Sequence, residues 1–196
     1  MSDETWSMGD TRRDIGRAPG GRTLTLRRTY PAAIEDVWDA CTTPERLGRF
    51  FAPVSGDLRE GGRFQIQGNA GGDILECDPP RLLRVTWAFG DRPPSEVRLR
   101  LLDEGPERTV LELEHAPVSD TVELAGRQVD PVLNDPETGI WGMGTGWEMG
   151  FIALDSYLRG AFPDEPPAPD SPELIALADR CGKEWAAAVA RSNTAG

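Results

Sequence analysis

Much of the chain alternates between apolar and polar positions with a period of two. Between Val54 and His115, short runs of this kind are separated by five clusters of turn residues rich in Gly, Pro, Asn and Asp. In residues 97–101, for example, Val, Leu and Leu alternate with two arginines. Such alternation places the apolar side chains on one face of a strand. Residues 54–115 therefore predict six consecutive antiparallel strands with one buried face and one wet face.

The segment before these strands predicts one more strand and two short helices. Residues 23–30 alternate and give the first of seven strands. Residues 34–41 then carry apolar side chains at helical spacing, and Thr43-Pro44-Glu45 has the cap chemistry that begins a second helix. Residues 1–22 show neither period, so we expect a flexible N-terminal tail.

A longer helix is predicted to begin near Thr145 and to end by Phe162. Its single apolar stripe falls at the spacing of an α-helix and consists of Trp147, Phe151, Leu154 and Leu158. A seven-stranded sheet with one apolar face needs a cover, and this helix carries the largest stripe. Residues 23–162 therefore predict one α+β domain in which the sheet packs on this helix.

Two segments lie outside this pattern. Residues 163–196 predict a proline-rich linker followed by an extra helix, which begins at Ser171-Pro172-Glu173. The apolar stripe of that helix, which includes Trp185, can pack on the main domain or on a second subunit of a homodimer. Residues 117–138 are polar, contain three prolines and have no period. A loop of this length is often a lid, so we expect it to gate a binding site.

Charge and composition exclude several classes of function. The formal net charge is −12, which disfavours binding to nucleic acid or to an anionic membrane surface. No apolar run has the length of a membrane span or the form of a signal peptide, so we expect a cytoplasmic protein. The three cysteines are far apart and lack C-x-x-C spacing. We therefore expect no metal and no cofactor.

Several segments of the chain resemble a known superfamily in the order expected for it. They are Arg28–Trp38, Thr43–Leu47, Phe50–Pro53, Asp57–Phe64, Gly72–Pro80, Trp87, Thr109–His115 and Gly146-Trp147. In these segments the chain resembles the SRPBCC superfamily, also called START-like or helix-grip proteins. Within it, the chain is similar to the branch named after the activator of the heat-shock chaperone ATPase. The resemblance implies a curved seven-stranded antiparallel sheet wrapped around the long helix, and it implies no single activity, because this fold hosts many.

A curved sheet around one helix leaves a cleft that can hold a small molecule. We therefore expect a small hydrophobic ligand, aromatic or polycyclic, between the sheet and the long helix. The side chains expected to line its site are Phe51, Phe64, Ile66, Trp87, Leu99, Leu113, His115, Trp147, Phe151 and Leu154. His115 is the only histidine and the named candidate for a catalytic residue, with a carboxylate in the cavity as the alternative. The alternative for His115 is a structural role, bonded to a nearby backbone group.

Two further hypotheses stay open at this point. The same fold can serve an enzyme such as a natural-product cyclase, or a self-resistance protein that sequesters a reactive metabolite. It can also serve a chaperone cofactor or a protein-interaction module that uses the C-terminal helix. A catalytic pair of carboxylates would have to lie in the cavity. We expect the four carboxylates that stand next to apolar positions in the sequence to face solvent instead. These are Glu76, Glu112, Glu114 and Glu148.

Overall fold

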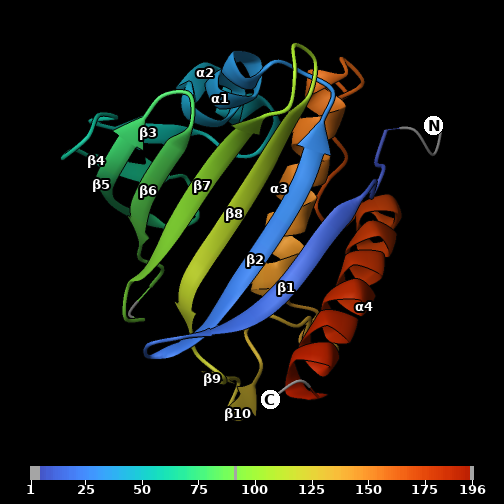
Figure 1. The fold of residues 1–196 in the computed structure, drawn as a ribbon. Coiled ribbons are helices and arrows are strands. Elements are labelled where there is room, and N and C mark those ends of the chain that lie inside the picture. Colours follow the sequence, from blue (N-terminus) through green and yellow to red (C-terminus); the bar gives the residue numbers. More distant parts are fainter. Residues whose placement is uncertain (1–4, 91, 195–196) are drawn as a thin grey trace.

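An antiparallel sheet curves around one long helix, and a second long helix lies beside it (Figure 1). The computed structural model describes residues 5–90 and 92–194. The eight strands of the sheet lie in the order β1-β2-β8-β7-β6-β5-β4-β3. Their bounds are β1 (Thr11–Ala18), β2 (Gly21–Tyr30), β3 (Val54–Gly56), β4 (Arg63–Ile66), β5 (Gly71–Asp78), β6 (Leu82–Trp87), β7 (Ser95–Asp103) and β8 (Thr109–Val118). The helices are α1 (Ile34–Thr42), α2 (Pro44–Phe50), α3 (Met143–Leu158) and α4 (Pro172–Thr194).

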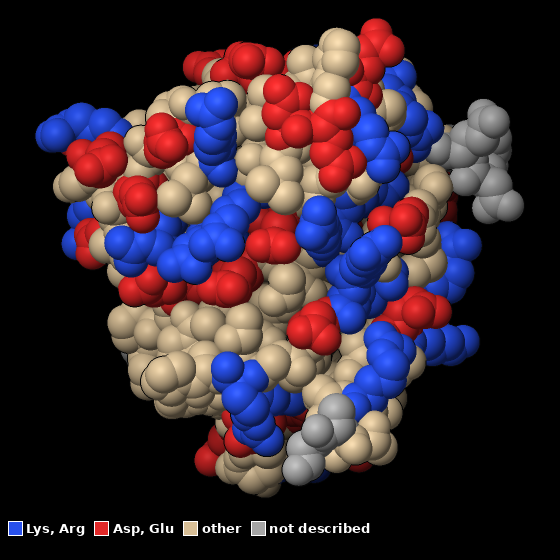
Figure 2. Space-filling model, in the orientation of Figure 1, with Lys and Arg blue, Asp and Glu red and all other residues tan. Residues whose placement is uncertain are grey.

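The α+β helix-grip architecture is confirmed. The six strands expected between Val54 and His115 are β3 to β8, and the two short helices α1 and α2 follow β2. Arg and acidic side chains interleave on the outer face of the sheet (Figure 2). Arg84 pairs there with Glu76 and Glu96, and Arg98 pairs with Glu114. This wet face explains the polar half of the alternation seen in the sequence.

The sheet has eight strands rather than the seven expected, because part of the predicted flexible tail is a strand. Residues 11–18 form β1, which pairs with β2 from Thr11↔Arg28 to Ala18↔Gly21. The sequence concealed this strand because Ile15 is its one large apolar residue on the buried face, where Arg13 is its neighbour. Residues 1–4 of the expected tail lie outside the described residues.

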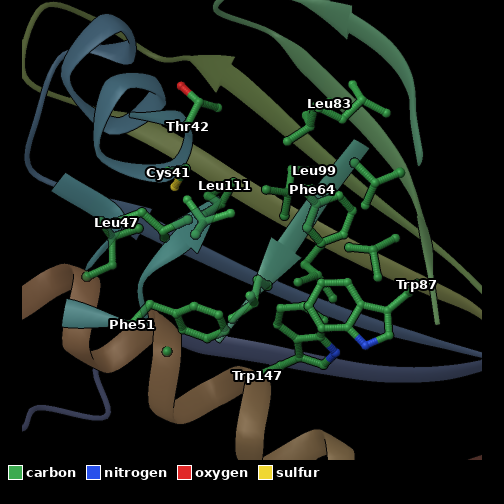
Figure 3. Close-up of a pocket in the computed structure, with 18 of the residues that line it drawn as sticks. Cys41, Thr42, Leu47, Phe51, Phe64, Leu83, Trp87, Leu99, Leu111 and Trp147 are labelled. Atoms are coloured by element: carbon green, nitrogen blue, oxygen red, sulfur yellow. The ribbon is translucent and has the colours of Figure 1, made fainter. Parts of the chain in front are cut away.

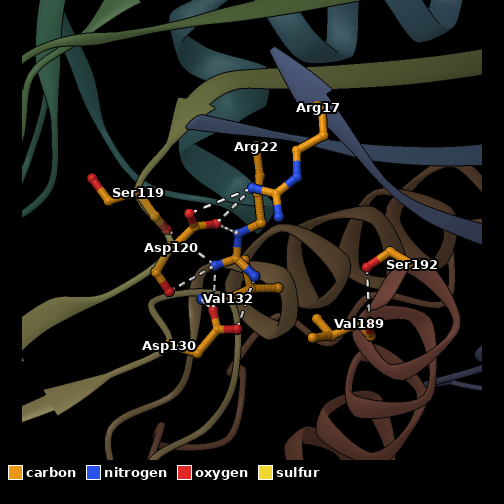
Figure 4. Close-up of polar contacts among 8 residues, drawn as sticks. All are labelled: Arg17, Arg22, Ser119, Asp120, Asp130, Val132, Val189 and Ser192. Carbon is orange, nitrogen blue, oxygen red and sulfur yellow. Dashed lines mark hydrogen bonds and ion pairs between the residues drawn. The ribbon is translucent and has the colours of Figure 1, made fainter. Parts of the chain in front are cut away.

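The segment 117–138 is more ordered than the loop that we expected. Strand β8 continues to Val118, and a small hairpin of β9 (Val122–Leu124) and β10 (Arg127–Val129) follows. Arg22 of β2 binds Asp130 with two hydrogen bonds, Nη2 to Oδ1 at 2.6 Å and Nη1 to Oδ2 at 2.8 Å (Figure 4). This charged pair fixes the segment to the sheet.

The C-terminal helix α4 packs within the chain, against β1 and α3 (Figure 1). Its buried side chains are Leu177, Ala178, Cys181, Trp185, Ala188 and Val189. A Cβ atom at Gly144 of α3 would lie 2.5 Å from the Trp185 ring, so only glycine allows this close approach. The apolar stripe expected for this helix is therefore buried against α3 and β1 of the same chain. A homodimer through this helix stays a prediction, and it would have to use the exposed face of α4.

Candidate functional site

An apolar cavity of about 180 Å³ lies between one half of the sheet and the helices α1, α2 and α3 (Figure 3). Strands β3 to β8 and the three helices all contribute side chains to its wall, whereas β1, β2 and α4 contribute none of the described lining residues. Alternation along the strands directs every second side chain inward. On α3, the residues Trp147, Gly150, Phe151 and Leu154 share the face that closes the cavity.

Most of the side chains expected to line a site do line this cavity. They are Phe51, Phe64, Ile66, Trp87, Leu99, Leu113, Trp147, Phe151 and Leu154. Their contact with a ligand stays a prediction. The tenth expected residue, His115, is not among the lining residues.

The part of the wall that comes from α1, α2 and the strands beside them was not expected from the sequence. Cys41 and Thr42 line the cavity from α1, Leu47 and Phe50 line it from α2, and Cys77 lines it from β5. In a sequence, an apolar helix face has the same pattern whether it packs against solid core or lines a cavity. The apolar pattern of these residues therefore indicates burial, but it does not indicate a cavity.

Four aromatic side chains form a continuous wall along the cavity, from Phe51 and Trp147 at α3 to Phe64 on β4. The rings of Phe51 and Trp147 lie 5° from parallel with their centroids 6.3 Å apart. The Trp147 and Trp87 centroids are 4.7 Å apart, and those of Trp87 and Phe64 are 6.0 Å apart. Gly150 makes room for Phe51, since a Cβ atom at that position would lie 3.1 Å from the ring. We call these four residues the aromatic wall.

His115 lies behind the aromatic wall and is fully buried. The indole Nε1 of Trp147 donates a hydrogen bond to His115 Nδ1 at 3.1 Å. This assigns the proton to Nε2, which donates to Ser95 Oγ at 2.6 Å, and Ser95 Oγ in turn donates to the Trp87 carbonyl at 3.4 Å. Burial lowers the pKa of His115 to about 4, so the ring is neutral near pH 7.

The arrangement of His115 differs from both roles expected for it. Its two ring nitrogens bind the side chains of Trp147 and Ser95 instead of a backbone group. It also lies outside the set of residues that line the cavity, so it has no direct path for proton transfer to a bound molecule. Its connection to the lining is the hydrogen bond that it accepts from Trp147.

One of the four carboxylates expected in solvent is buried. Glu148 is 0 % exposed and accepts a hydrogen bond from Arg13 Nε at 2.8 Å, with a second contact from Nη2. It lies on the side of α3 that faces β1 and α4, away from the cavity. Buried charges in proteins are paired, and the arginine of β1 provides that partner here. The other three, Glu76, Glu112 and Glu114, are half-buried or less and pair with arginines on the outer face of the sheet.

None of the described residues that line the cavity is charged. Their side-chain polar groups are the indole N–H groups of Trp87 and Trp147, the thiols of Cys41 and Cys77, and the Thr42 hydroxyl, which donates to the Trp38 carbonyl at 2.8 Å. Burial raises the pKa of both thiols, that of Cys41 to about 12, so both are protonated and neutral. Within the described part of the chain, no three His, Cys, Asp or Glu side chains gather to hold a metal ion. The chemistry of this cavity is that of apolar burial.

The cavity reaches the surface at the turn after β3, and this opening is called the mouth. Leu58, in that turn, lines the cavity and is 38 % exposed. The segment 117–138, which we expected to gate the site, contributes no lining residue and lies at the opposite end of the sheet (Figure 1). The expected lid is therefore wrong, because the ion pair of Arg22 with Asp130 holds this segment away from the mouth.

The fold and the cavity define a helix-grip protein with a hollow, apolar interior. The family model described as Activator of Hsp90 ATPase homolog 1-like protein matches residues 31–159, and the chain belongs to this family. No curated protein matches the chain. No helix in the described part of the chain is both long and apolar enough to cross a lipid bilayer.

Solved structures support the same assignment. The crystal structure of CalU16 from Micromonospora echinospora is 40% identical, covers 92% of this chain and 98% of its own, and superposes with a TM-score of 0.71. The solution NMR structure of CalU16 is 39% identical, covers 95% and 98%, and has a TM-score of 0.73. DynU16, described as a putative protein in the dynemicin biosynthetic locus, is 20% identical, covers 79% of this chain and 59% of its own, and has a TM-score of 0.53. DynU16 therefore shares the fold.

Proposed function

We propose that this protein binds a small uncharged apolar molecule in the cavity between the sheet and α3. The observation that carries the proposal is a cavity of about 180 Å³ whose described lining has no charged side chain. An apolar cavity of roughly 150 Å³ in a protein core stays free of water and accepts benzene, so the volume is sufficient for a small guest. Binding would replace exposed apolar surface by contact, at about 25 cal/mol per Å².

Binding is favoured over catalysis by the chemistry of the wall. General acid or base catalysis needs a titratable group within hydrogen-bond reach of the reacting atom. The described lining offers protonated thiols and one hydroxyl that is already bonded to the Trp38 carbonyl. The one histidine is separated from the cavity by Trp147. These groups hold a molecule, and they do not provide proton transfer to it.

Titration with toluene tests the proposal. The wild-type protein should bind toluene with saturation, followed by calorimetry and by tryptophan fluorescence, since Trp87 and Trp147 line the cavity. Leu99→Trp fills the cavity from β7 and should weaken binding more than about tenfold, because an overpacked site has no room for the guest. Leu102→Trp is the matched control: Leu102 lies on the same strand, is 45 % exposed and is absent from the lining.

Two results would contradict the proposal. One is the absence of saturable binding to the wild-type protein. The other is equal weakening by the Leu99 and Leu102 variants, because that would place toluene on the surface instead of in the cavity.

A further inference from the structure

The aromatic side chains of the lining form one contiguous group. The four rings of the aromatic wall follow one another along the cavity, and aliphatic side chains that include Leu83, Leu99 and Leu111 complete the lining (Figure 3). A flat ring in the cavity would therefore have aromatic rings within reach of its face. Aromatic pairs gain free energy beyond the burial of their area, provided that the rings hold a suitable relative orientation.

We propose that the ligand of this cavity carries a flat, uncharged aromatic ring, and that His115 is the positioning residue that holds the aromatic wall in the orientation selecting it. The proposal rests on the proposed function, because it concerns the same cavity. It adds the class of ligand and the residue that determines the preference for this class.

The role of His115 follows from one chain of hydrogen bonds. An indole N–H in an apolar interior requires an acceptor, and His115 Nδ1 supplies it at 3.1 Å from Trp147 Nε1. The chain continues through Ser95 and ends on the carbonyl of Trp87. The chain thereby links the ring of Trp147 to the backbone of Trp87. Without the acceptor, the indole N–H of Trp147 is left unpaired and its ring turns toward another partner.

His115 is also placed so that orientation and contact can be separated by experiment. It packs edge-on against both tryptophans, with centroids 6.1 Å from Trp87 and 5.9 Å from Trp147, and it does not line the cavity. A substitution at His115 therefore removes no atom that a ligand touches. It changes only how the wall is held.

The absence of charge in the ligand follows from the described lining. A charged group in this cavity would lose its hydration and find no partner of opposite charge. The Thr42 hydroxyl is already used by the Trp38 carbonyl, so a strongly polar ligand would gain little from it. An uncharged aromatic ring requires no such partner.

Toluene and methylcyclohexane are suitable matched probes, since they share a carbon skeleton and differ in the flat aromatic ring. We expect the wild-type protein to bind toluene about fivefold more tightly than methylcyclohexane, in line with one aromatic pairing. In His115→Leu the ratio of the two dissociation constants should fall to about one, with the affinity for methylcyclohexane retained. His115→Asn places an acceptor oxygen close to the position of Nδ1 and should restore the preference for toluene.

If His115→Leu does not fold, Trp147→Phe tests the role of the hydrogen bond between Trp147 and His115. It keeps a ring in the wall but cannot donate to His115, so it should lose the preference as well. A preference for toluene that survives in Trp147→Phe, or in a folded His115→Leu, overturns the role of His115. Equal binding of the two probes to the wild-type protein overturns the aromatic class and leaves the proposed function intact. Binding of neither probe contradicts the proposed function itself.

Discussion

The space between the sheet and the helices is occupied differently under the two halves of the sheet. Under β1 and β2, the interior is filled and joined by buried ion pairs, Arg13 with Glu148 and Arg28 with Asp155. Under β3 to β8, the described lining carries no charge and leaves a cavity of about 180 Å³. The filled half uses α4 as an additional layer beside α3. The comparison indicates that one half maintains the fold while the other is free to hold a guest.

Helix α3 belongs to both halves and has a separate face for each. Trp147, Phe151 and Leu154 point to the cavity, whereas Glu148 and Asp155 point to the arginines of β1 and β2. Because Trp147 and Glu148 are adjacent in sequence, a displacement of α3 on its polar side would be transmitted to the aromatic wall. The ion pairs thus fix the helix on which the cavity depends.

Truncation of a leucine in each half should show the largest contrast. Leu26 of β2 is fully buried in the filled half, and Leu26→Ala should lower the free energy of unfolding by about 4 kcal/mol. Leu99→Ala should cost about half as much, near 2 kcal/mol, because one side of Leu99 already faces the cavity. Urea unfolding of both variants measures the difference. Equal losses would show that the two halves are packed alike.

Breaking the ion pair of the filled half should have the next largest effect. Glu148→Leu leaves Arg13, whose side chain is 10% exposed, with only the longer contact to Glu184 at 4.0 Å, and it should lower the free energy of unfolding by about 3 kcal/mol. Arg13→Met combined with Glu148→Leu should recover most of this loss, since no buried charge is then left unpaired and the side chain of Glu184 is 55% exposed. Urea unfolding of the single and double variants tests both statements. A double variant as unstable as Glu148→Leu would argue against the pair as the cause.

His115, which lies behind the aromatic wall, should make the free energy of unfolding depend on pH. An unfolded histidine has a pKa near 6.5, and burial lowers the pKa of His115 to about 4. As the pH falls through this window, the unfolded chain takes up a proton that the folded chain does not, so stability decreases and this contribution becomes constant below about pH 4. We expect a loss of about 2 kcal/mol between pH 7 and pH 4.5.

The His115→Asn variant isolates that effect, because its carboxylates titrate as in the wild-type protein. The free energy of unfolding of the variant, measured at both pH values, should fall by about 2 kcal/mol less than that of the wild type. Identical pH dependence in the two proteins would mean that His115 is not buried in its neutral form.

The smallest effect is expected on the outer face of the sheet. Arg98 pairs there with Glu114 at 3.2 Å, and the two side chains are 34% and 39% exposed. Arg98→Gln should change the free energy of unfolding by less than about 0.5 kcal/mol, because water already screens this pair. Thermal unfolding is sufficient to measure it. A loss comparable with that of Glu148→Leu would remove the distinction between surface and buried pairs on which the comparison depends.

The sequence predicted those parts of the fold in which burial produces a regular pattern. The alternation of Val97, Leu99 and Leu101 identified a strand and its inward face, and the spacing from Trp147 to Leu154 identified the helix that closes the cavity. Strand β1 was missed because its inward Arg13 interrupts the apolar pattern. A pattern of single residues cannot show that a distant Glu148 neutralises that arginine.

The same reasoning explains which parts of the candidate site were found. Trp87 and Trp147 were expected in the wall because they lie on a strand and a helix that had to face each other. The hydrogen-bond chain through His115 and Ser95 depends on the register of β7 with β8, where Val97 lies opposite His115. That register is set by the whole sheet, and no local spacing reveals it. The cavity is the space that remains because the side chains do not fill the whole volume between the sheet and the helices. The order of residues along the chain does not determine that remaining volume.

Diffraction from crystals of the wild-type protein under xenon pressure tests most directly whether the second half of the molecule is hollow and apolar. We predict xenon density inside the cavity, bounded by Leu99, Phe64 and Trp147, and none beneath β1 and β2. A cavity region without xenon, filled instead by its own side chains, would contradict the account.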